Sequence, residues 1–344
     1  MSLRSYVVAR VLLTIPMILL LLTMVFLIIR VMPGDPADLH FEKRVDPETL
    51  AAFKQRLGLD KPLPIQYVDY VAGLLTGNLG SSMQDYSPIG QQIFSAFPAT
   101  LELAIYSAAF AIIVGVLLGV RASRSYNSIP DHTIRIFGIV SYAIPVFFLG
   151  EVLIMIFGIY LGWFPTGLRF SPRMDAPQGL QLGGWRLATG LYTVDSLLEG
   201  NLTKFLESVR YLFLPVLALG TVLCGIFIRM TRSNMLETLR LDFVTSARAR
   251  GLKERAVVYA YALRNAFLPI LTMMGLQFAA LLAGAVLTET TFSWPGLGRY
   301  LVARITFRDY TAIQGTVVFY GVIVALVSLI VDVLYAYLDP RIRF

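Results

Sequence analysis

The sequence predicts an all-α membrane protein with about six transmembrane helices. Of its 344 residues, 56% are hydrophobic and 15% are charged, and the mean hydropathy is +0.68. Soluble domains carry about 25% charged residues, so this chain has too few to cover a water-facing surface of its size. The hydrophobic residues instead gather in runs of about 20 residues, the length that an α-helix needs to cross the bilayer core.

Six such runs follow one another along the chain. They are expected to span the membrane at residues 9–30, 99–121, 134–161, 211–229, 268–288 and 312–338. The first run follows two arginines, as in a secretory signal peptide. Its hydrophobic stretch is longer than the roughly 7–15 residues of such a signal and no cleavage site follows it, so we expect a retained helix. The third run is the longest and contains Pro145, which predicts a kink or an interfacial extension.

The distribution of basic residues predicts which side of the membrane each connection faces. Arginine and lysine dominate the short connection at 121–135 and the one at 230–267, and arginines also flank both chain ends. Short basic connections stay on the cytoplasmic side. Both termini are therefore expected in the cytoplasm. The long connections at 31–98 and 162–210 are expected outside, and the second of these contains no motif that indicates a chemistry.

Composition also limits the possible chemistry. The net charge is +7, but the basic residues lie in loops beside apolar runs, which favours the anionic cytoplasmic leaflet over nucleic acid as their partner. Cys224 is the sole cysteine, and His40 and His132 are far apart in the sequence. These residues form no disulfide framework, zinc motif or nucleophile constellation. We expect no cofactor or metal in this chain and no catalytic activity.

The connection at 31–98 is predicted to contain two short helices. Asp46 and Pro47 have the residue types of an N-cap and a first helical position, and Gly58 is a plausible C-cap. Pro64 opens a second amphipathic stretch that runs to about Leu75. Both helices carry an apolar face that must pack on the bundle or on a partner. We favour a structural cap over a partner contact.

The connection at 230–267 is the most informative. Asp242 can cap a helix of about eight residues that stops at Gly251, and a helix this short is not stable alone in water. Ala247 and Ala249 are small and allow another surface to approach closely, while Arg248 and Arg250 add positive charge. Such an element could lie on anionic lipid or dock on a cytoplasmic partner, and the spacing alone does not decide between them.

Several motifs in and around this connection resemble those of a known family. Residues 247–255 (Ala-Arg-Ala-Arg-Gly-Leu-Lys-Glu-Arg) and 262–269 (Ala-Leu-Arg-Asn-Ala-Phe-Leu-Pro) are similar to the EAA loop of permease subunits of ABC importers, in the form found in the dipeptide/oligopeptide/nickel branch. Further matches lie at 33–36, 57–62, 229–237, 284–299 and 339–343. Together they cover nearly the whole chain.

The resemblance implies a type I ABC importer permease fold. Residues 1–98 would hold the first transmembrane helix and an external helical loop, and 99–344 the core permease domain. The implied partners are a second permease subunit, two ATPase subunits that bind ATP and Mg²⁺, and an external solute-binding protein. The coupling residues carried over from the family are Asp242, Phe243, Ala247, Arg248, Ala249, Arg250, Gly251, Leu252 and Pro269.

The implied function is ATP-driven import of dipeptides or oligopeptides across a bacterial or archaeal inner membrane. Nickel, glutathione and oligosaccharides are the alternative substrates within the family. An ion-coupled secondary transporter is a less favoured alternative, because no convincing internal repeat is found and charged sites are sparse. The chain departs from the family pattern at Phe243, where Tyr is usual, and at Tyr261, where His is usual. Docking is expected to survive both changes.

Three residues in or near the membrane are candidates for a pathway or a structural role. Glu151 lies in the third run and Asp332 in the sixth, and a carboxylate inside the membrane needs a partner. We favour a locally hydrogen-bonded structural role for Glu151, where the family commonly has an apolar residue, and local pairing for Asp332. Trp294 belongs to the stretch 293–300, which is expected to seat the last two spans, with an outer gate as the alternative.

Overall fold

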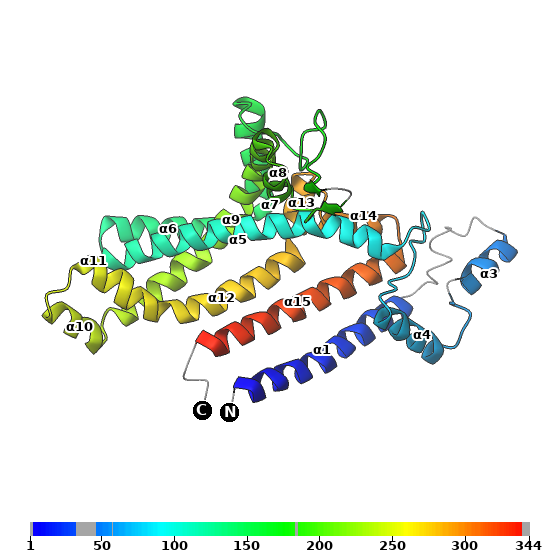
Figure 1. Cartoon of the computed structure of the whole chain (residues 1–344), viewed down its shortest axis with the longest axis horizontal. Helices are drawn as coiled ribbons and strands as arrows, with labels where there is room; N and C mark the ends of the chain where they lie inside the picture. The colour runs from blue at the N-terminus through cyan, green and yellow to red at the C-terminus, as the bar shows by residue number, and fades with distance from the viewer. Residues whose placement is uncertain (1–2, 32–45, 57, 183–184, 339–344) are drawn as a thin grey trace.

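The computed structural model describes residues 3–31, 46–56, 58–182 and 185–338, and most of these residues are helical (Figure 1). Among them, five long helices are apolar enough to cross a membrane, and the crossings number six if a bent pair of shorter helices is counted as one span. The long helices are α1 (Leu3–Val31), α5 (Ile89–Arg124), α9 (Leu202–Thr238), α12 (Leu263–Gly284) and α15 (Tyr310–Leu338). The predicted helical membrane fold with about six crossings is confirmed.

Helices α5 and α9 pack against each other over much of their length. A Cβ atom on Gly115 of α5 would lie 2.5 Å from the Cβ of Phe227, and one on Gly119 would lie 2.6 Å from the Cβ of Thr231. These distances are shorter than any real contact between such atoms, so the spacing of the two helices requires glycine. Small residues at contact positions are typical of helix pairs in membranes, where close van der Waals packing drives association.

Helix α6 (Ile129–Ala143) also packs on α9, and a Cβ atom on Gly225 would lie only 2.3 Å from the carbonyl oxygen of Gly138. We expect Gly225→Ala to push the helices apart and to lower the free energy of unfolding by about 1–3 kcal/mol. Thermal unfolding of the purified protein in detergent measures this effect. The matched control is Gly90→Ala in α5, where the added Cβ meets nothing nearer than 4.0 Å. An equal loss of stability in both variants would contradict the packing explanation.

The third run does not form a straight span. Helix α6 ends at Ala143, and the chain resumes after Pro145 as α7 (Val146–Leu153), which continues into the π-helical stretch η1 (Ile154–Tyr160). The two parts are bent by 101°. The kink predicted at Pro145 is confirmed, but one continuous span over 134–161 is wrong. Proline disfavours a helical residue before it, and Ile144 accordingly has an extended backbone with ψ of 126°.

The short elements gather at two places. The loop elements α10 (Asp242–Ala249), α11 (Glu254–Ala256) and the π-helical stretch η2 (Val257–Ala262) lie at one end of the molecule, and α3 (Pro47–Arg56) and α4 (Leu63–Leu75) lie at the other (Figure 1). The remaining described elements are a two-stranded hairpin and three short helices. They are β1 (Leu180–Leu182), β2 (Trp185–Leu187), α8 (Tyr192–Leu198), α13 (Val286–Thr291) and α14 (Leu297–Thr306). In Figure 1, α7 and α8 rise from the side of the bundle.

The two predicted helices between the first and second spans are present. Asp46 caps α3, because its carboxylate accepts hydrogen bonds from the backbone nitrogen and the hydroxyl of Thr49, both at 2.9 Å. These bonds favour the charged form and lower the pKa of Asp46. Gly58 adopts a φ of +67° after α3, as a C-cap residue should. The second helix, α4, starts after Pro62, slightly earlier than predicted.

Helix α4 is fastened to α1, which supports the predicted structural cap. The Arg30 guanidinium donates to the Gln66 side-chain oxygen at 2.8 Å, and the hydroxyls of Thr23 and Tyr67 are 2.7 Å apart. The motifs at 33–36 and 339–343, as well as His40, lie outside the described residues. The domain boundary predicted at residue 98 falls within α5.

Candidate functional site

The loop 230–267 places a short helix, α10, at the tip of the molecule (Figure 1). Gly251 stops it as predicted: its φ is +75°, and a Cβ atom added to it would meet no neighbouring side chain or backbone within 4 Å. The predicted cap by Asp242 is wrong, because Leu241 occupies the N-cap position and no side chain caps the helix. Asp242 stands in the first turn, where its negative charge is favourable near the helix N-terminus.

The chain itself supports α10. Val244 and Ala247 are buried in one hydrophobic cluster, whose other buried members are Val120, Met235, Val257, Val258, Ala262 and Ala266. This cluster joins α10 to the ends of α5 and α9 and to η2. The inference that a partner must stabilise the short helix is therefore wrong, and so is the placement of Ala247 on a free surface. The small side chain of Ala247 serves close packing inside the subunit.

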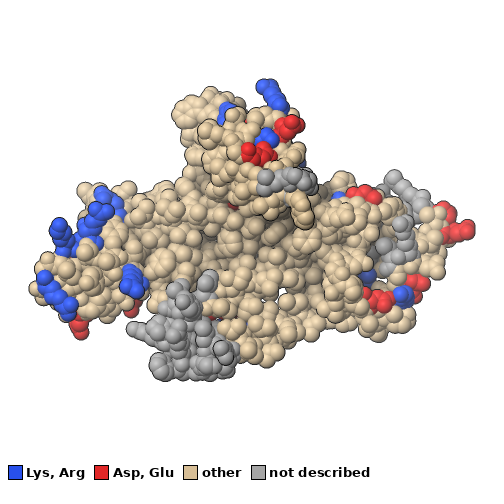
Figure 2. All heavy atoms as spheres, viewed as in Figure 1, with Lys and Arg blue, Asp and Glu red and all other residues tan. Residues whose placement is uncertain are grey.

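The opposite face of α10 and its flanks are free in this chain. We call this set the docking face: Leu241, Phe243, Ala249, Arg250 and Leu252, all exposed. Phe243 is 37% exposed, and Leu241 and Leu252 are exposed beside it. Arginines and lysines gather around the docking face at this end (Figure 2). The face therefore combines apolar anchors with positive charge, as protein interfaces commonly do.

Arg248 is occupied within the subunit. Its guanidinium donates two hydrogen bonds to the Glu254 carboxylate, at 2.9 and 3.2 Å, across the turn that contains Gly251. These bonds raise the pKa of Arg248. Both side chains are about half exposed, so the pair orients the turn more than it stabilises the fold.

Pro269 does not end the loop helix. Helix α12 runs from Leu263 through Pro269, and the stretch from Glu254 to Leu282 is one continuous span. The fifth crossing, expected from residue 268, therefore belongs to a helical span that starts earlier, within the loop. A proline removes one helical hydrogen bond, which membrane helices tolerate when neighbouring groups satisfy the freed carbonyl. The consequence is that α12 reaches directly from the loop into the bundle.

Sequence reasoning missed a buried ion pair that joins α5 to the connection at 162–210. Arg169 donates to the Glu102 carboxylate at 2.6 and 3.0 Å, and both side chains are almost fully buried. The backbone nitrogen and the hydroxyl of Thr193 donate to the other oxygen of Glu102 at 2.8 and 2.7 Å. The Arg169 guanidinium also lies 3.8 Å from the Tyr192 ring centroid. A carboxylate within the apolar run 99–121 was the signal that could have indicated this pair.

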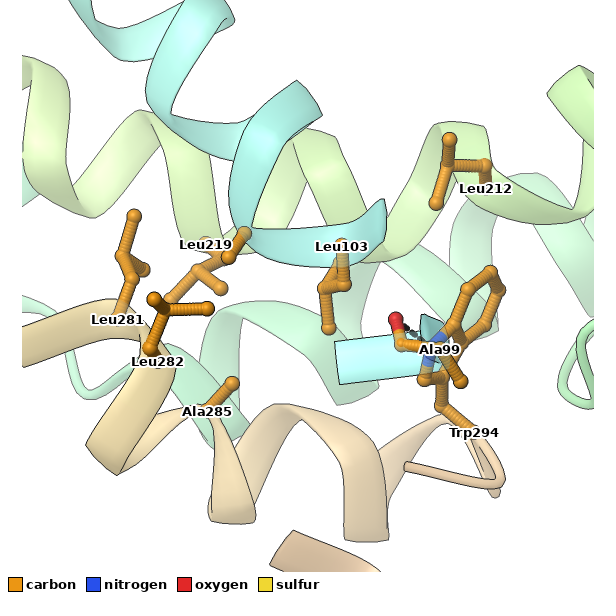
Figure 3. Close-up of a cluster of buried hydrophobic side chains, with 9 residues drawn as sticks. Ala99, Leu103, Leu212, Leu219, Leu281, Leu282, Ala285 and Trp294 are labelled. Atoms are coloured by element: carbon orange, nitrogen blue, oxygen red, sulfur yellow. Dashed lines mark hydrogen bonds between the residues drawn. The ribbon is translucent and has the colours of Figure 1, made fainter. Parts of the chain in front are cut away.

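Trp294 lies in the hydrophobic core between the long helices. It is 1% exposed, and its indole nitrogen donates to the Ala99 carbonyl at 2.9 Å (Figure 3). Figure 3 shows the surrounding side chains from α5, α9 and α12: Leu103, Leu212, Leu219, Leu281 and Leu282. These contacts are those of a packing residue that seats the turn before α14 against α5.

A second buried carboxylate, Glu289, fastens the same turn. It accepts a hydrogen bond from the Thr100 hydroxyl at 2.6 Å and one from the backbone nitrogen of Arg299 at 2.9 Å. A Cβ atom on Gly296 would lie 2.3 Å from this carboxylate, so the turn can close over it only with glycine. The stretch 293–300 is thus locked to α5 through polar as well as apolar contacts.

The two membrane carboxylates that the sequence analysis named differ in whether they have a partner. Asp332 forms an ion pair with Arg10 at 3.2 Å, which links α15 to α1 and confirms the predicted local pairing. Glu151, on α7, is exposed, and it makes no hydrogen bond or ion pair with any residue that the structure describes. The favoured local hydrogen bond for Glu151 is therefore wrong.

A bundle with five to six apolar helices long enough to cross a membrane defines a multi-pass membrane protein. The chain belongs to the family described as the inner membrane component of binding-protein-dependent transport systems, which matches residues 111–344. Residues 3–104 match the N-terminal region of such membrane components. The chain is thus a permease subunit that resides in the inner membrane.

Relatives of this chain match it over nearly its whole length. It is 43% identical over 340 residues to the di/tripeptide transport system permease protein DppB of Pseudomonas aeruginosa (strain UCBPP-PA14), with 98% of each chain covered. It is 39% identical, with 98% of each chain covered, to the dipeptide transport system permease protein DppB of Escherichia coli K12. It is 36% identical, with 99% of each covered, to the glutathione transport system permease protein GsiC of Salmonella choleraesuis (strain SC-B67).

Proposed function

We propose that this chain forms half of the translocation pathway of an ATP-driven importer of dipeptides or oligopeptides. The full-length similarity to di- and tripeptide permeases supports the substrate class. The sequence contains no Gly-x-x-x-x-Gly-Lys-Ser/Thr phosphate loop, so in an ATP-driven importer another subunit must bind ATP. The docking face offers the surface on which that ATPase subunit would bind. The observation that carries the proposal is the exposed Phe243 on a helix that the chain itself holds in place.

The proposed assembly contains a second permease subunit, two ATPase subunits and an external solute-binding protein. The ATPases bind ATP and Mg²⁺, and α10 with Asp242, Phe243, Ala249, Arg250, Gly251 and Leu252 would fit a groove on one of them. The α10 end then faces the cytoplasm. Helix α1 begins and α15 ends on that same side of the molecule, which agrees with cytoplasmic termini (Figure 1).

The buried cluster around α10 gives the coupling a physical route. Val244 and Ala247 of α10 pack against Val120 of α5, Met235 of α9 and Val258 of η2. Close-packed side chains of this kind cannot be compressed, so a displacement of α10 must move the ends of the three spans. We infer that closure of the ATPases shifts these ends together and alternates the pathway between inward-open and outward-open states.

Uptake into proteoliposomes tests the proposed function. The complete assembly is reconstituted with the binding protein and a radiolabelled dipeptide outside the vesicles, and with the ATPases facing the lumen. We expect the dipeptide to accumulate in the lumen only when the lumen contains ATP and Mg²⁺. A protonophore should leave the rate unchanged. Uptake driven by a proton or sodium gradient without ATP would contradict the proposal and support an ion-coupled transporter.

Glutathione is the second candidate substrate, because one relative over the full chain length is a glutathione permease. Nickel and oligosaccharides remain weaker alternatives within the same class of importer. Calorimetric titration of the solute-binding protein with dipeptides and with glutathione distinguishes the candidates. We expect dipeptides to bind more tightly.

A further inference from the structure

A pocket of about 450 Å³ lies between the C-terminal half of α6 and the part of α9 from Gly225 to Ser233. Its floor is the close contact of Gly138 with Gly225, where the absence of side chains hollows the surface. Its walls include the apolar side chain of Ile139 and the ring of Tyr142. The pocket uses none of the residues of the docking face or of the Glu102–Arg169 pair.

Three arginines stand around this pocket, and one of them is neutralised. Arg232 donates to both oxygens of Asp131, at 2.6 and 2.7 Å, and this carboxylate is fully buried. Arg135 and Arg229 are exposed, and neither makes a hydrogen bond or ion pair within the described part of the chain. The Arg229 guanidinium lies 5.7 Å from the centroid of the Tyr142 ring. Two uncompensated positive charges therefore remain at the pocket.

An apolar stripe runs along α6 beside the two free arginines. Ile136, Ile139 and Val140 are each at least about half exposed and follow one another at helical spacing on the same face. A ligand matching this surface has an anionic head for the arginines and a long hydrocarbon tail for the stripe. A short zwitterionic peptide has the first feature and lacks the second.

We propose that this pocket binds an anionic phospholipid of the cytoplasmic leaflet. The phosphate lies between Arg135 and Arg229, which can each donate to its oxygens, and an acyl chain lies along Ile136, Ile139 and Val140. Basic pockets between transmembrane helices on the cytoplasmic side are suited to such headgroups because they meet the phosphate at its own depth. The bound lipid would brace α6 against α9 beside the cluster that supports α10.

Lipid retention by the whole transporter complex tests the proposal. The complex is reconstituted in nanodiscs of phosphatidylcholine with phosphatidylglycerol, extracted in mild detergent and analysed by native mass spectrometry. Loss of both charges in an Arg135→Gln/Arg229→Gln variant is expected to weaken retention of phosphatidylglycerol by about 30-fold. Retention of phosphatidylcholine should not change.

Two controls separate the pocket from general charge and folding effects. An Arg121→Gln/Arg264→Gln variant removes the same charge from exposed positions on α5 and α12 outside the pocket, and it should retain the lipid like the unmodified complex. An Arg135→Lys/Arg229→Lys variant keeps the charge and should retain most of the affinity. Equal losses in both glutamine variants, or no loss in either, would overturn the proposal. So would unchanged lipid retention with impaired peptide uptake, which would place the arginines in the translocation pathway.

Discussion

Replacing Phe243 with alanine is expected to detach the permease from its ATPase partner while the permease stays folded. The side chain is 37% exposed and lies outside the hydrophobic cluster that holds α10, so its loss leaves no cavity in the subunit. Aromatic anchors at the centre of an interface contribute about 2 kcal/mol or more, which corresponds to roughly 30-fold weaker binding. Co-purification with the ATPase and ATP-driven uptake should both fall, with little change in thermal stability.

Phe307→Ala is the matched control for this change. Phe307 is also an exposed phenylalanine at a helix end, but it follows α14, away from the docking face. We expect it to leave ATPase binding intact. Ala249→Trp, which adds bulk to the docking face without touching the buried cluster, should weaken binding as Phe243→Ala does. If Phe243→Ala and Ala249→Trp both bound the ATPase normally and supported uptake, α10 would not be the coupling element.

Arg169→Met is expected to destabilise the permease severely. It leaves the Glu102 carboxylate buried at 1% exposure, with only the Thr193 donors for compensation. Removing one partner of a buried ion pair typically costs about 3–5 kcal/mol because the remaining charge is unpaired. Since the pair connects α5 with the connection at 162–210, we expect that connection to detach first. Thermal unfolding and limited proteolysis of the purified protein measure the two effects.

A double variant shows whether the unpaired charge is the cause. Glu102→Gln combined with Arg169→Met removes both charges and should recover much of the lost stability, since the glutamine can still bond to Thr193. Lys61→Met breaks an exposed ion pair with Asp69 and should change stability little. If the double variant were as unstable as Arg169→Met alone, the arginine would act through its packing on Tyr192 and not through its charge.

The membrane crossings could be predicted because they depend on local composition. Runs of apolar residues identified the five long helices and the bent pair, and helices extend beyond the runs where the residues become amphipathic, as α9 does from 211–229 to Leu202–Thr238. Pro145 indicated the kink through its own covalent geometry. The size of the bend, 101°, was not predictable, because it depends on how α7 packs against α9 and on the contact of Gly150 with Phe292.

The sequence predicted the position of the candidate site but not which of its residues are exposed. The motif around Gly251 located the short helix α10, because helix stops and small residues are local features. Tertiary packing decided which of two alanines is buried: Ala247 belongs to the buried cluster that includes Val258, and Ala249 is exposed. Spacing along an eight-residue helix defines its faces but not which of them meets the rest of the subunit.

Composition, hydrophobic runs and basic loops were sufficient to predict a membrane protein with about six crossings. The partners of its charged residues depended on the folded chain. Glu102 meets Arg169 and Asp131 meets Arg232 across separations of 67 and 101 residues, while the more conspicuous Glu151 meets nothing in the described structure. A buried charge needs a partner, but the chain only brings that partner within hydrogen-bonding distance when distant helices pack together.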